Sequence, residues 1–536
     1  MTAPAEGPRR GVSGETLLFW LLVILHLAPI WAFPFIPTQD GPGHQEVAFV
    51  LRQYDQPEAG LLRQYYLPNR EALPNWFVFF LMSKALAFVS VPVAEKILLT
   101  GYVLLLPLSV RYALRAIDPR AAFLAVLAFP FTFNFLFQMG FFNFCFSLPA
   151  FFFALGYWLQ APERMTLGRT CGLAALVLWV YFCHPVTLAV TVAALLTLAG
   201  WRALLERRQW LAASKKWLLG PILACLPALV LMAAFVGRRT GAKVSMLPLW
   251  VKVKHLAGLY SLASLSRWTI PLALLLALLF YAAVLACLRA RGRGPFGVGD
   301  GFLLVAAACT VAYFAAPSEL AGGGFINHRL NLFPFLALIL WFGAFEHPPR
   351  RRLWVQTAAA GIALGFLGVF AWSYARIDAG LSAIAAAGAH VEPDHTLLFL
   401  SYAHQGETAD GRPLAFRTEP FVHAGGYIGA RKRMVDLSLY EAGENYFPIY
   451  FNPRLDPFRH LATVPLGIEA VPPRVDLLGY PKRTGGRVDY VLLWGLRKER
   501  RDEPAVQETL RQLAEGYEGV WASADGAVAL YRRNRT

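Results

Sequence analysis

The chain has 536 residues, of which 57% are hydrophobic and only 16% are charged. Soluble domains usually carry about 25% charged residues, so this composition excludes an ordinary water-soluble enzyme and favours a multi-pass membrane protein. The formal net charge of +16 does not indicate a nucleic-acid partner, because Lys and Arg lie mostly between apolar segments, where topology and lipid headgroups account for them.

Apolar segments long enough to cross a hydrocarbon core recur through the first two thirds of the chain. They predict about eleven membrane-spanning helices, at residues 15–36, 96–112, 121–138, 141–160, 170–183, 186–201, 217–236, 269–288, 299–316, 327–345 and 353–374. Segment 75–91 is also apolar, but Lys84 lies in its middle, so we expect an interfacial or re-entrant helix there. The total is about 11–13 helices, depending on this segment and on the break at His184–Pro185.

Beyond residue 374 charged and turn-forming residues become frequent and no further span is predicted. Short strand-like runs at 396–402, 488–494, 520–524 and 527–531, with an amphipathic helix at 503–517, predict a small α/β domain. We therefore expect a mainly α protein, with a transmembrane domain at 1–374 and a soluble extracytoplasmic domain at 375–536.

Basic loops give the predicted orientation. Arg and Lys cluster in the loops near residues 202–216, 289–293 and 350–352, and these loops fall on one side of the membrane. By the positive-inside rule that side is the cytoplasm. The soluble domain then lies outside, together with the loops 37–74, 138–143, 237–267 and 318–329.

Loop 37–74 carries the candidate acid–base residues. Asp40 lies in a turn-forming stretch directly after the first helix, and His44 and Glu46 follow it. A carboxylate held close above the membrane can accept a proton from an attacking hydroxyl group, or can bind a divalent cation such as Mg²⁺ or Mn²⁺. The alternative is a solvated turn with ordinary polar residues.

Cations on the same external side are candidates for binding a phosphate. Exported loops usually avoid Lys and Arg, yet loop 237–267 contains Arg238, Arg239, Lys252 and Lys254 and no acidic residue. His328 and Arg329 open a helix on this side, where a positive charge opposes the helix dipole. Contact with anionic lipid, or snorkelling of Arg329 to headgroups, is the alternative. Gln138 and Asn143 mark the external break between two Phe-rich helices, where a tight turn is the simplest interpretation.

The soluble domain offers further polar residues without a defined role. His423, Asp436, Tyr440 and Glu441 are suited to binding a sugar or a peptide. A packed loop is an equally simple interpretation.

The arrangement resembles the C-type (GT-C) superfamily of polytopic glycosyltransferases. Three places carry the resemblance: Asp40 soon after the first helix, the run from Ala128 to Asn143 across a Pro-containing helix end, and the run from His328 into a Leu-rich helix. Here Gly41 follows Asp40 where a second acid is frequent, and residues 140–143 contain no acid. Leu330 stands where the family has Tyr.

The resemblance implies transfer of a hexosyl or pentosyl group from a polyprenyl-phosphate-linked donor to a lipid, glycan or protein acceptor. Asp40 would act as base or position the acceptor, with His44 or Glu46 assisting, and the cations would stabilise the leaving phosphate. It also implies a location in the bacterial inner membrane. A transporter or flippase of a lipid-linked or anionic substrate, and a non-catalytic assembly or sensor protein, are the alternatives.

Overall fold

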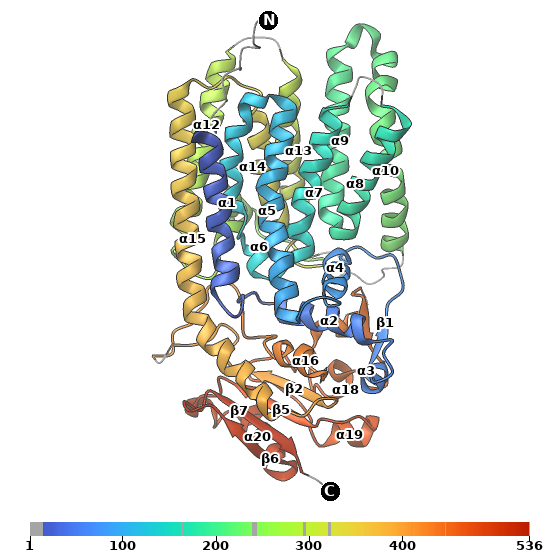
Figure 1. Cartoon of the computed structure of the whole chain (residues 1–536), viewed down its shortest axis with the longest axis vertical. Coiled ribbons are helices and arrows are strands. Elements are labelled where there is room, and N and C mark those ends of the chain that lie inside the picture. Colours follow the sequence, from blue (N-terminus) through green and yellow to red (C-terminus); the bar gives the residue numbers. More distant parts are fainter. Residues whose placement is uncertain are drawn as a thin grey trace, which may run out of the picture.

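A computed structural model describes residues 14–161, 165–237, 244–292, 296–319, 323–408, 410–444 and 446–534. The long helices run side by side along the long axis of the molecule, and a small sheet lies beyond one end of this bundle (Figure 1). The mainly α architecture with a C-terminal α/β region agrees with the prediction from sequence.

Eight helices of the described ranges are long and apolar enough to cross a membrane. They are α1 (Gly14–Ala32), α5 (Val91–Ile117), α7 (Phe142–Leu159), α9 (Pro185–Leu205), α10 (Trp210–Gly237), α12 (Thr269–Arg291), α13 (Gly301–Ala315, preceded by the 3-10 turn η4, Val298–Asp300) and α15 (Pro349–Ala386, continued by the 3-10 turn η5, Ala387–His390). Three shorter apolar helices are η1 (Pro119–Phe131), α8 (Leu167–Cys183) and α14 (Ile326–Phe342). These eleven segments overlap the predicted spans, but η1, α8 and α14 are shorter than the others. The eight long apolar helices are consistent with an integral membrane protein.

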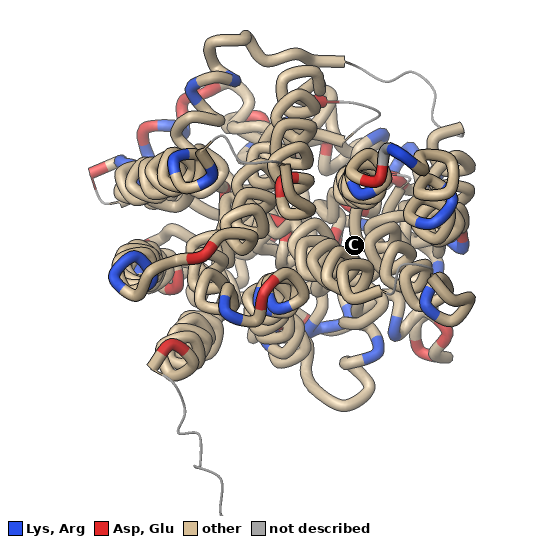
Figure 2. Tube along the Cα trace, turned by 90° about the horizontal axis from the view of Figure 1, so that it is seen from above, with Lys and Arg blue, Asp and Glu red and all other residues tan. Residues whose placement is uncertain are grey.

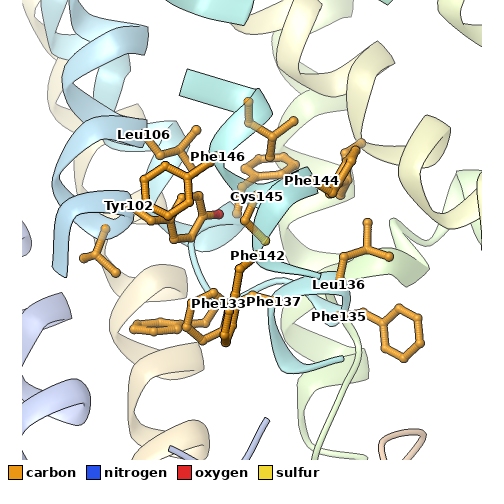
Figure 3. Close-up of a cluster of buried hydrophobic side chains, with 14 of the residues drawn as sticks. Tyr102, Leu106, Phe133, Phe135, Leu136, Phe137, Phe142, Phe144, Cys145 and Phe146 are labelled. Atoms are coloured by element: carbon orange, nitrogen blue, oxygen red, sulfur yellow. The ribbon is translucent and has the colours of Figure 1, made fainter. Parts of the chain in front are cut away.

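The segment predicted as one helix at 121–138 is broken. A 3-10 helix, η1, ends at Phe131, and the four-residue α6 (Phe135–Gln138) follows. Asn134 causes the new start, because its side chain accepts hydrogen bonds from the backbone N–H groups of Leu136 and Phe137. Figure 3 shows the Phe-rich core in which α6 and the start of α7 pack beside Tyr102 of α5.

Segment 75–91 does not span. It forms α4 (Phe77–Ala85), which has nine residues where a span needs about 20. At the other uncertain point, α8 ends at Cys183 and α9 begins at Pro185. His184 separates them and accepts a hydrogen bond on Nδ1 from the N–H of Val186 at 3.2 Å, so the break is a capped helix start.

Loop 37–74 is folded into the C-terminal region. It contains α2 (Gly41–Gln53), α3 (Gly60–Tyr65) and β1 (Tyr66–Pro68). Strand β1 pairs antiparallel with β4 (Ile449–Phe451), more than 380 residues later in the chain. A second hydrophobic core joins side chains from this loop to those of residues 398–517.

The main sheet has five strands in the order β3-β2-β5-β7-β6. Strand β2 (Thr396–Ser401) is parallel to β3 (Val435–Asp436) and β5 (Tyr490–Trp494), whereas β7 (Val528–Arg533) is antiparallel to β5 and to β6 (Tyr517–Ala522). The remaining elements are α16 (Gly426–Lys432), α17 (Tyr440–Gly443), α18 (Pro457–His460), α19 (Gly479–Thr484), η6 (Lys498–Arg500), α20 (Pro504–Gly516), and, outside this region, η2 (Arg207–Gln209), α11 (Leu249–Ala257) and η3 (Tyr260–Leu262).

The predicted external loops gather at the end of the bundle that carries the sheet. The N–H of Leu265 donates to the carbonyl of Phe416 at 2.9 Å, the N–H of Glu419 donates to the side chain of Gln39 at 3.0 Å, and Ser245 bridges to Glu319. The basic loops lie at the opposite end. Figure 2 looks down on that end, where Lys and Arg occur on helix ends and connecting loops.

Candidate functional site

The loop after α1 pairs with the loop before α7. The N–H of Gln39 donates to the carbonyl of Gln138 at 3.0 Å, and the N–H of Asp40 donates to the carbonyl of Met139 at 3.2 Å. Gly140 follows with a φ of +85°, and a Cβ atom there would collide with Asp40. Only glycine combines this φ with so close an approach, and the pairing fixes the position of the Asp40 carboxylate.

Asp40 is buried and touches side chains of the C-terminal region. Tyr440 Oη donates to Asp40 Oδ2 at 3.0 Å, and His423 Nε2 lies 3.9 Å from Asp40 Oδ1. Burial raises the pKa of Asp40 to about 7, although the Tyr440 hydrogen bond lowers it; the charge of Glu469 raises it further, and that of Arg329 lowers it. A carboxyl group that titrates near neutral pH is well suited to accept a proton.

His44 lies one turn into α2 and lines the same cavity as Asp40. Its Nε2 is 3.7 Å from Oε1 of the buried Glu441, and its ring packs edge-on against Phe79 and Phe142. Burial lowers the pKa of His44 to about 3. The imidazole is therefore neutral near pH 7 and can donate or accept a hydrogen bond.

Glu46 holds two parts of the fold together and is not among the residues that line the cavity. Its Oε1 accepts a hydrogen bond from the N–H of Asp436 at 3.1 Å, and Gly429 of α16 leaves room for the carboxylate. Burial raises the pKa of Glu46 well above its usual value. Glu46 thus joins α2 to the C-terminal region and does not reach Asp40, contrary to the expectation that it assists there.

A cavity of about 600 Å³ lies where the bundle meets the C-terminal region. Its polar lining comes from both parts of the chain: Gln39, Asp40, His44, Asn75, Asn143, His184, Arg329, His423, Tyr440, Tyr446 and Glu469. Its apolar lining includes Leu188 and Ala189 of α9 and Leu229, Met232, Phe235 and Val236 of α10. Leu229 and Val236 are 40% and 58% exposed, so this wall reaches the exposed outer face of the bundle. The cavity suits a ligand with a polar head and a hydrocarbon chain.

Arg329 places a buried positive charge in this cavity. Its Nη1 donates to the carbonyl of Gly324, and its guanidinium lies over the rings of Phe141 and Phe144, 4.7 and 5.8 Å from their centres. Within the described ranges its Nε has no hydrogen-bond partner. Because Arg329 lines the cavity, its guanidinium group supplies a positive charge for an anionic ligand beside Asp40.

The other predicted cations that the structure describes do not line the cavity. Lys252 donates to two carbonyls at the end of α13, at 2.7 and 2.9 Å, and so caps that helix. Lys254 is exposed, and His328 packs among neighbouring aromatic rings. Arg238 and Arg239 lie outside the described residues. Of the predicted phosphate-binding residues that the structure describes, only Arg329 faces Asp40.

Gln138 and Asn143 hold the second loop in place. Gln138 Oε1 accepts a hydrogen bond from Tyr374 of α15 at 3.0 Å. Asn143 lines the cavity, and its side chain also accepts from the N–H of Val78 and donates to the carbonyl of Asn75, which fixes the start of α4.

The residues near Asp40 do not form a cation site. Among the described ranges no group of three His, Cys, Asp or Glu side chains is arranged to hold a metal ion. The Asp40 carboxylate contacts the Tyr440 phenol and the His423 imidazole, and the charges of Arg329, Glu469 and Glu441 interact with it. The two direct contacts do not match the several oxygen ligands that Mg²⁺ or Mn²⁺ prefer.

Sequence reasoning did not find Glu469, and it gave no role to His423 or Tyr440. Glu469 lies in an irregular loop, and no spacing in the sequence relates it to Asp40. Only the folded structure marks Glu469 as a candidate site residue. Burial raises the pKa of its carboxyl group to about 7, and the charges of Glu419 and Glu444 add to this shift.

No protein-family model and no curated protein matches this sequence. The assignment of function therefore depends on the residues and geometry of the site.

Proposed function

We propose that the protein is a membrane glycosyltransferase that moves a sugar from a polyprenyl-phosphate-linked donor to an acceptor at the outer face of a bacterial inner membrane. One observation carries the proposal: a single cavity combines the Asp40 carboxylate and the Arg329 guanidinium with an apolar wall of α9 and α10 that reaches the exposed outer face of the bundle. A lipid-linked sugar phosphate has the same combination of hydrocarbon chain, anionic group and polar head.

The orientation follows from charge. The basic loops lie at the end of the bundle opposite the sheet (Figure 1), whereas the cavity is lined by residues of the C-terminal region. Loops rich in Lys and Arg stay in the cytoplasm. The cavity and the soluble region then face outward. The hydrocarbon chain of the donor would lie along α10, within the membrane.

The reaction needs one base and one anion-stabilising group. The acceptor hydroxyl oxygen attacks the anomeric carbon of the sugar while the bond from this carbon to the phosphate oxygen breaks. The phosphate leaves with the electron pair, and the hydroxyl proton passes to Asp40. Arg329 stabilises the charge that develops on the leaving phosphate.

A transporter or flippase is the competing class. Intramembrane transport sites usually lie near the bilayer midplane, between repeated helical units. Here the polar residues of the cavity gather at one end of the bundle, against the soluble region. This position supports chemistry at the interface.

The test is turnover of lipid-linked sugars by the full-length protein in lipid nanodiscs. Short-chain polyprenyl-phosphate hexoses and pentoses are the probes, membrane extract supplies acceptors, and release of polyprenyl phosphate is measured by mass spectrometry. Wild-type protein should release it, and Asp40→Asn should slow release by about 10²–10⁴-fold. Glu499→Gln, which changes an exposed carboxylate, is the matched control.

Unchanged turnover by the Asn variant would remove Asp40 from the mechanism. Absence of release from every donor, combined with movement of intact donor across the membrane of proteoliposomes, would favour a flippase.

A further inference from the structure

His423 lies between two carboxyl groups. Its Nε2 is 3.9 Å from Asp40 Oδ1, and its Nδ1 is 4.0 Å from Glu469 Oε1. Within the described ranges neither His423 Nδ1 nor Glu469 Oε1 has a hydrogen-bond partner. The ring stacks on Tyr440, with 4.6 Å between ring centres, and this contact fixes its plane.

Exposure increases along this row of side chains. The exposed fraction is 4% for the Asp40 side chain, 9% for His423 and 23% for Glu469. The row therefore leads from the buried carboxylate toward solvent, and all three residues line the cavity.

We infer that His423 and Glu469 form a proton relay that carries away the proton taken up by Asp40. This inference rests on the proposed function, in which Asp40 becomes protonated in each turnover. The Asp40 carboxyl group gives its proton to His423 Nε2, and the Nδ1–H of the same ring passes to Glu469 Oε1. One N–H bond forms as the other breaks, so the imidazole ends as the other neutral tautomer and Glu469 releases the proton to water. Before the next turnover the ring regains its first tautomer by losing the Nε2 proton to water in the cavity and gaining one at Nδ1.

The acid–base properties fit such a relay. Burial raises the pKa of both Asp40 and Glu469 to about 7, so transfer between them is nearly balanced in energy. Burial lowers the pKa of His423 to about 3, and this favours passage through neutral tautomers over a stable imidazolium. Other titratable groups also act on the row. They are Arg329 and Tyr440 on Asp40, His404 and His44 on His423, Glu419 and Glu444 on Glu469, and Glu441, whose charge interacts with both Asp40 and Glu469.

Both distances exceed a normal hydrogen bond by about 1 Å. Catalytic hydrogen bonds are often long without substrate and shorten in the reactive complex, and a water molecule can also bridge such a gap. His423 and Glu469 are positioning residues in this scheme, because they act through Asp40.

The first experiment needs no turnover. Dicyclohexylcarbodiimide, an apolar reagent, modifies protonated buried carboxyl groups, and mass spectrometry of the full-length protein would give the pH at which Asp40 is half modified. Glu469→Gln removes a charge that raises the pKa of Asp40, so this midpoint should fall to lower pH. Glu499→Gln should leave it unchanged. An unchanged midpoint in Glu469→Gln would overturn the coupling.

The second experiment measures release of polyprenyl phosphate. His423→Ala should reduce kcat about tenfold or more with little change in the KM for donor, and added imidazole should restore much of the rate. His390→Ala, at an exposed histidine that stacks on Trp521 away from the cavity, is the control. Loss of activity without rescue, in a variant that folds and binds donor normally, would overturn the relay. If the wild-type protein releases nothing, the proposed function fails, and the relay fails with it even where the carbodiimide midpoints show coupled carboxyl groups.

Discussion

Tyr440 donates a hydrogen bond of 3.0 Å to Asp40, 400 residues earlier in the chain. The acceptor stands in the loop after the first apolar helix, and the donor stands in the C-terminal region. The cavity is thus complete only when both parts of the chain are folded together.

Removal of this hydrogen bond should raise the pKa of Asp40. The Tyr440 hydroxyl stabilises the charged carboxylate, and hydrogen bonds to charged groups contribute about 1.5–3 kcal/mol. In Tyr440→Phe the pH below which donor turnover is lost should therefore move upward by about 1 unit, because Asp40 must be deprotonated to act as a base. Tyr450→Phe, in β4, should leave the profile in place. A profile of Tyr440→Phe that moves to lower pH would contradict the assigned hydrogen bond.

Binding of the donor should depend on the shape of the cation at position 329. Lys retains the charge but loses the planar set of donors that bonds Gly324 and that would bind the phosphate in the proposed reaction. Arg329→Lys should raise the KM for the lipid-linked donor by about tenfold, and Arg329→Met should have a larger effect. Lys254→Met, an exposed cation in the same group of loops, should change little. A stronger effect of the Lys254 substitution would place the phosphate at loop 237–267.

Gly429 should be needed for docking of the C-terminal region. A methyl group at this position in α16 would overlap the Glu46 carboxylate, and overpacking of this kind typically costs about 1–3 kcal/mol. Gly429→Ala should lower the Tm of the detergent-solubilised protein, followed by intrinsic Trp fluorescence. Gly519→Ala is the matched control, because a Cβ atom there meets only one ring atom at 3.9 Å. Equal Tm values for the two variants would show that α2 and α16 can separate without cost.

The orientation can be tested by thiol labelling in a background without the six native cysteines. Three exposed positions belong to segments that pack with the C-terminal region: Glu58 lies between α2 and α3, Lys254 lies in α11 close to the segment bonded by Arg417, and Glu499 lies in η6. The exposed Arg208 lies in η2, in the basic loop 202–216. Single cysteines at the first three positions should react with an impermeant maleimide in intact cells. Cysteine at 208 should react only after permeabilisation. Labelling of 208 in intact cells, with protection of the other three, would invert the proposed orientation.

The helical bundle was largely predictable because a helix that can cross a membrane is visible in the sequence as a long apolar run. The short α4 was recognisable because Lys84 interrupts its segment. The break at 132–134 was not recognised, because it depends on the side chain of Asn134 bonding to the backbone within an otherwise apolar run.

The site was only partly predictable. Asp40 and Arg329 were detectable as charges beside apolar helices, and the structure places both in one cavity. Lys252 looked equally suitable, but it caps α13. Glu469 and the pairing of β1 with β4 depend on contacts between distant parts of the chain, and local sequence patterns do not record such contacts.

Helix α15 runs without interruption for 38 residues, from the basic end of the bundle to the C-terminal region. The number of residues in α15 sets the rotation and the distance between the bundle and the C-terminal region, because an α-helix turns by about 100° and rises about 1.5 Å for each residue. One residue inserted near Gly365 would swing the whole C-terminal region about a quarter turn and carry Tyr440 and His423 away from Asp40. Seven inserted residues would nearly restore the angle but would displace the region by about 10 Å. The cavity therefore depends on the number of residues in α15 as well as on their identity.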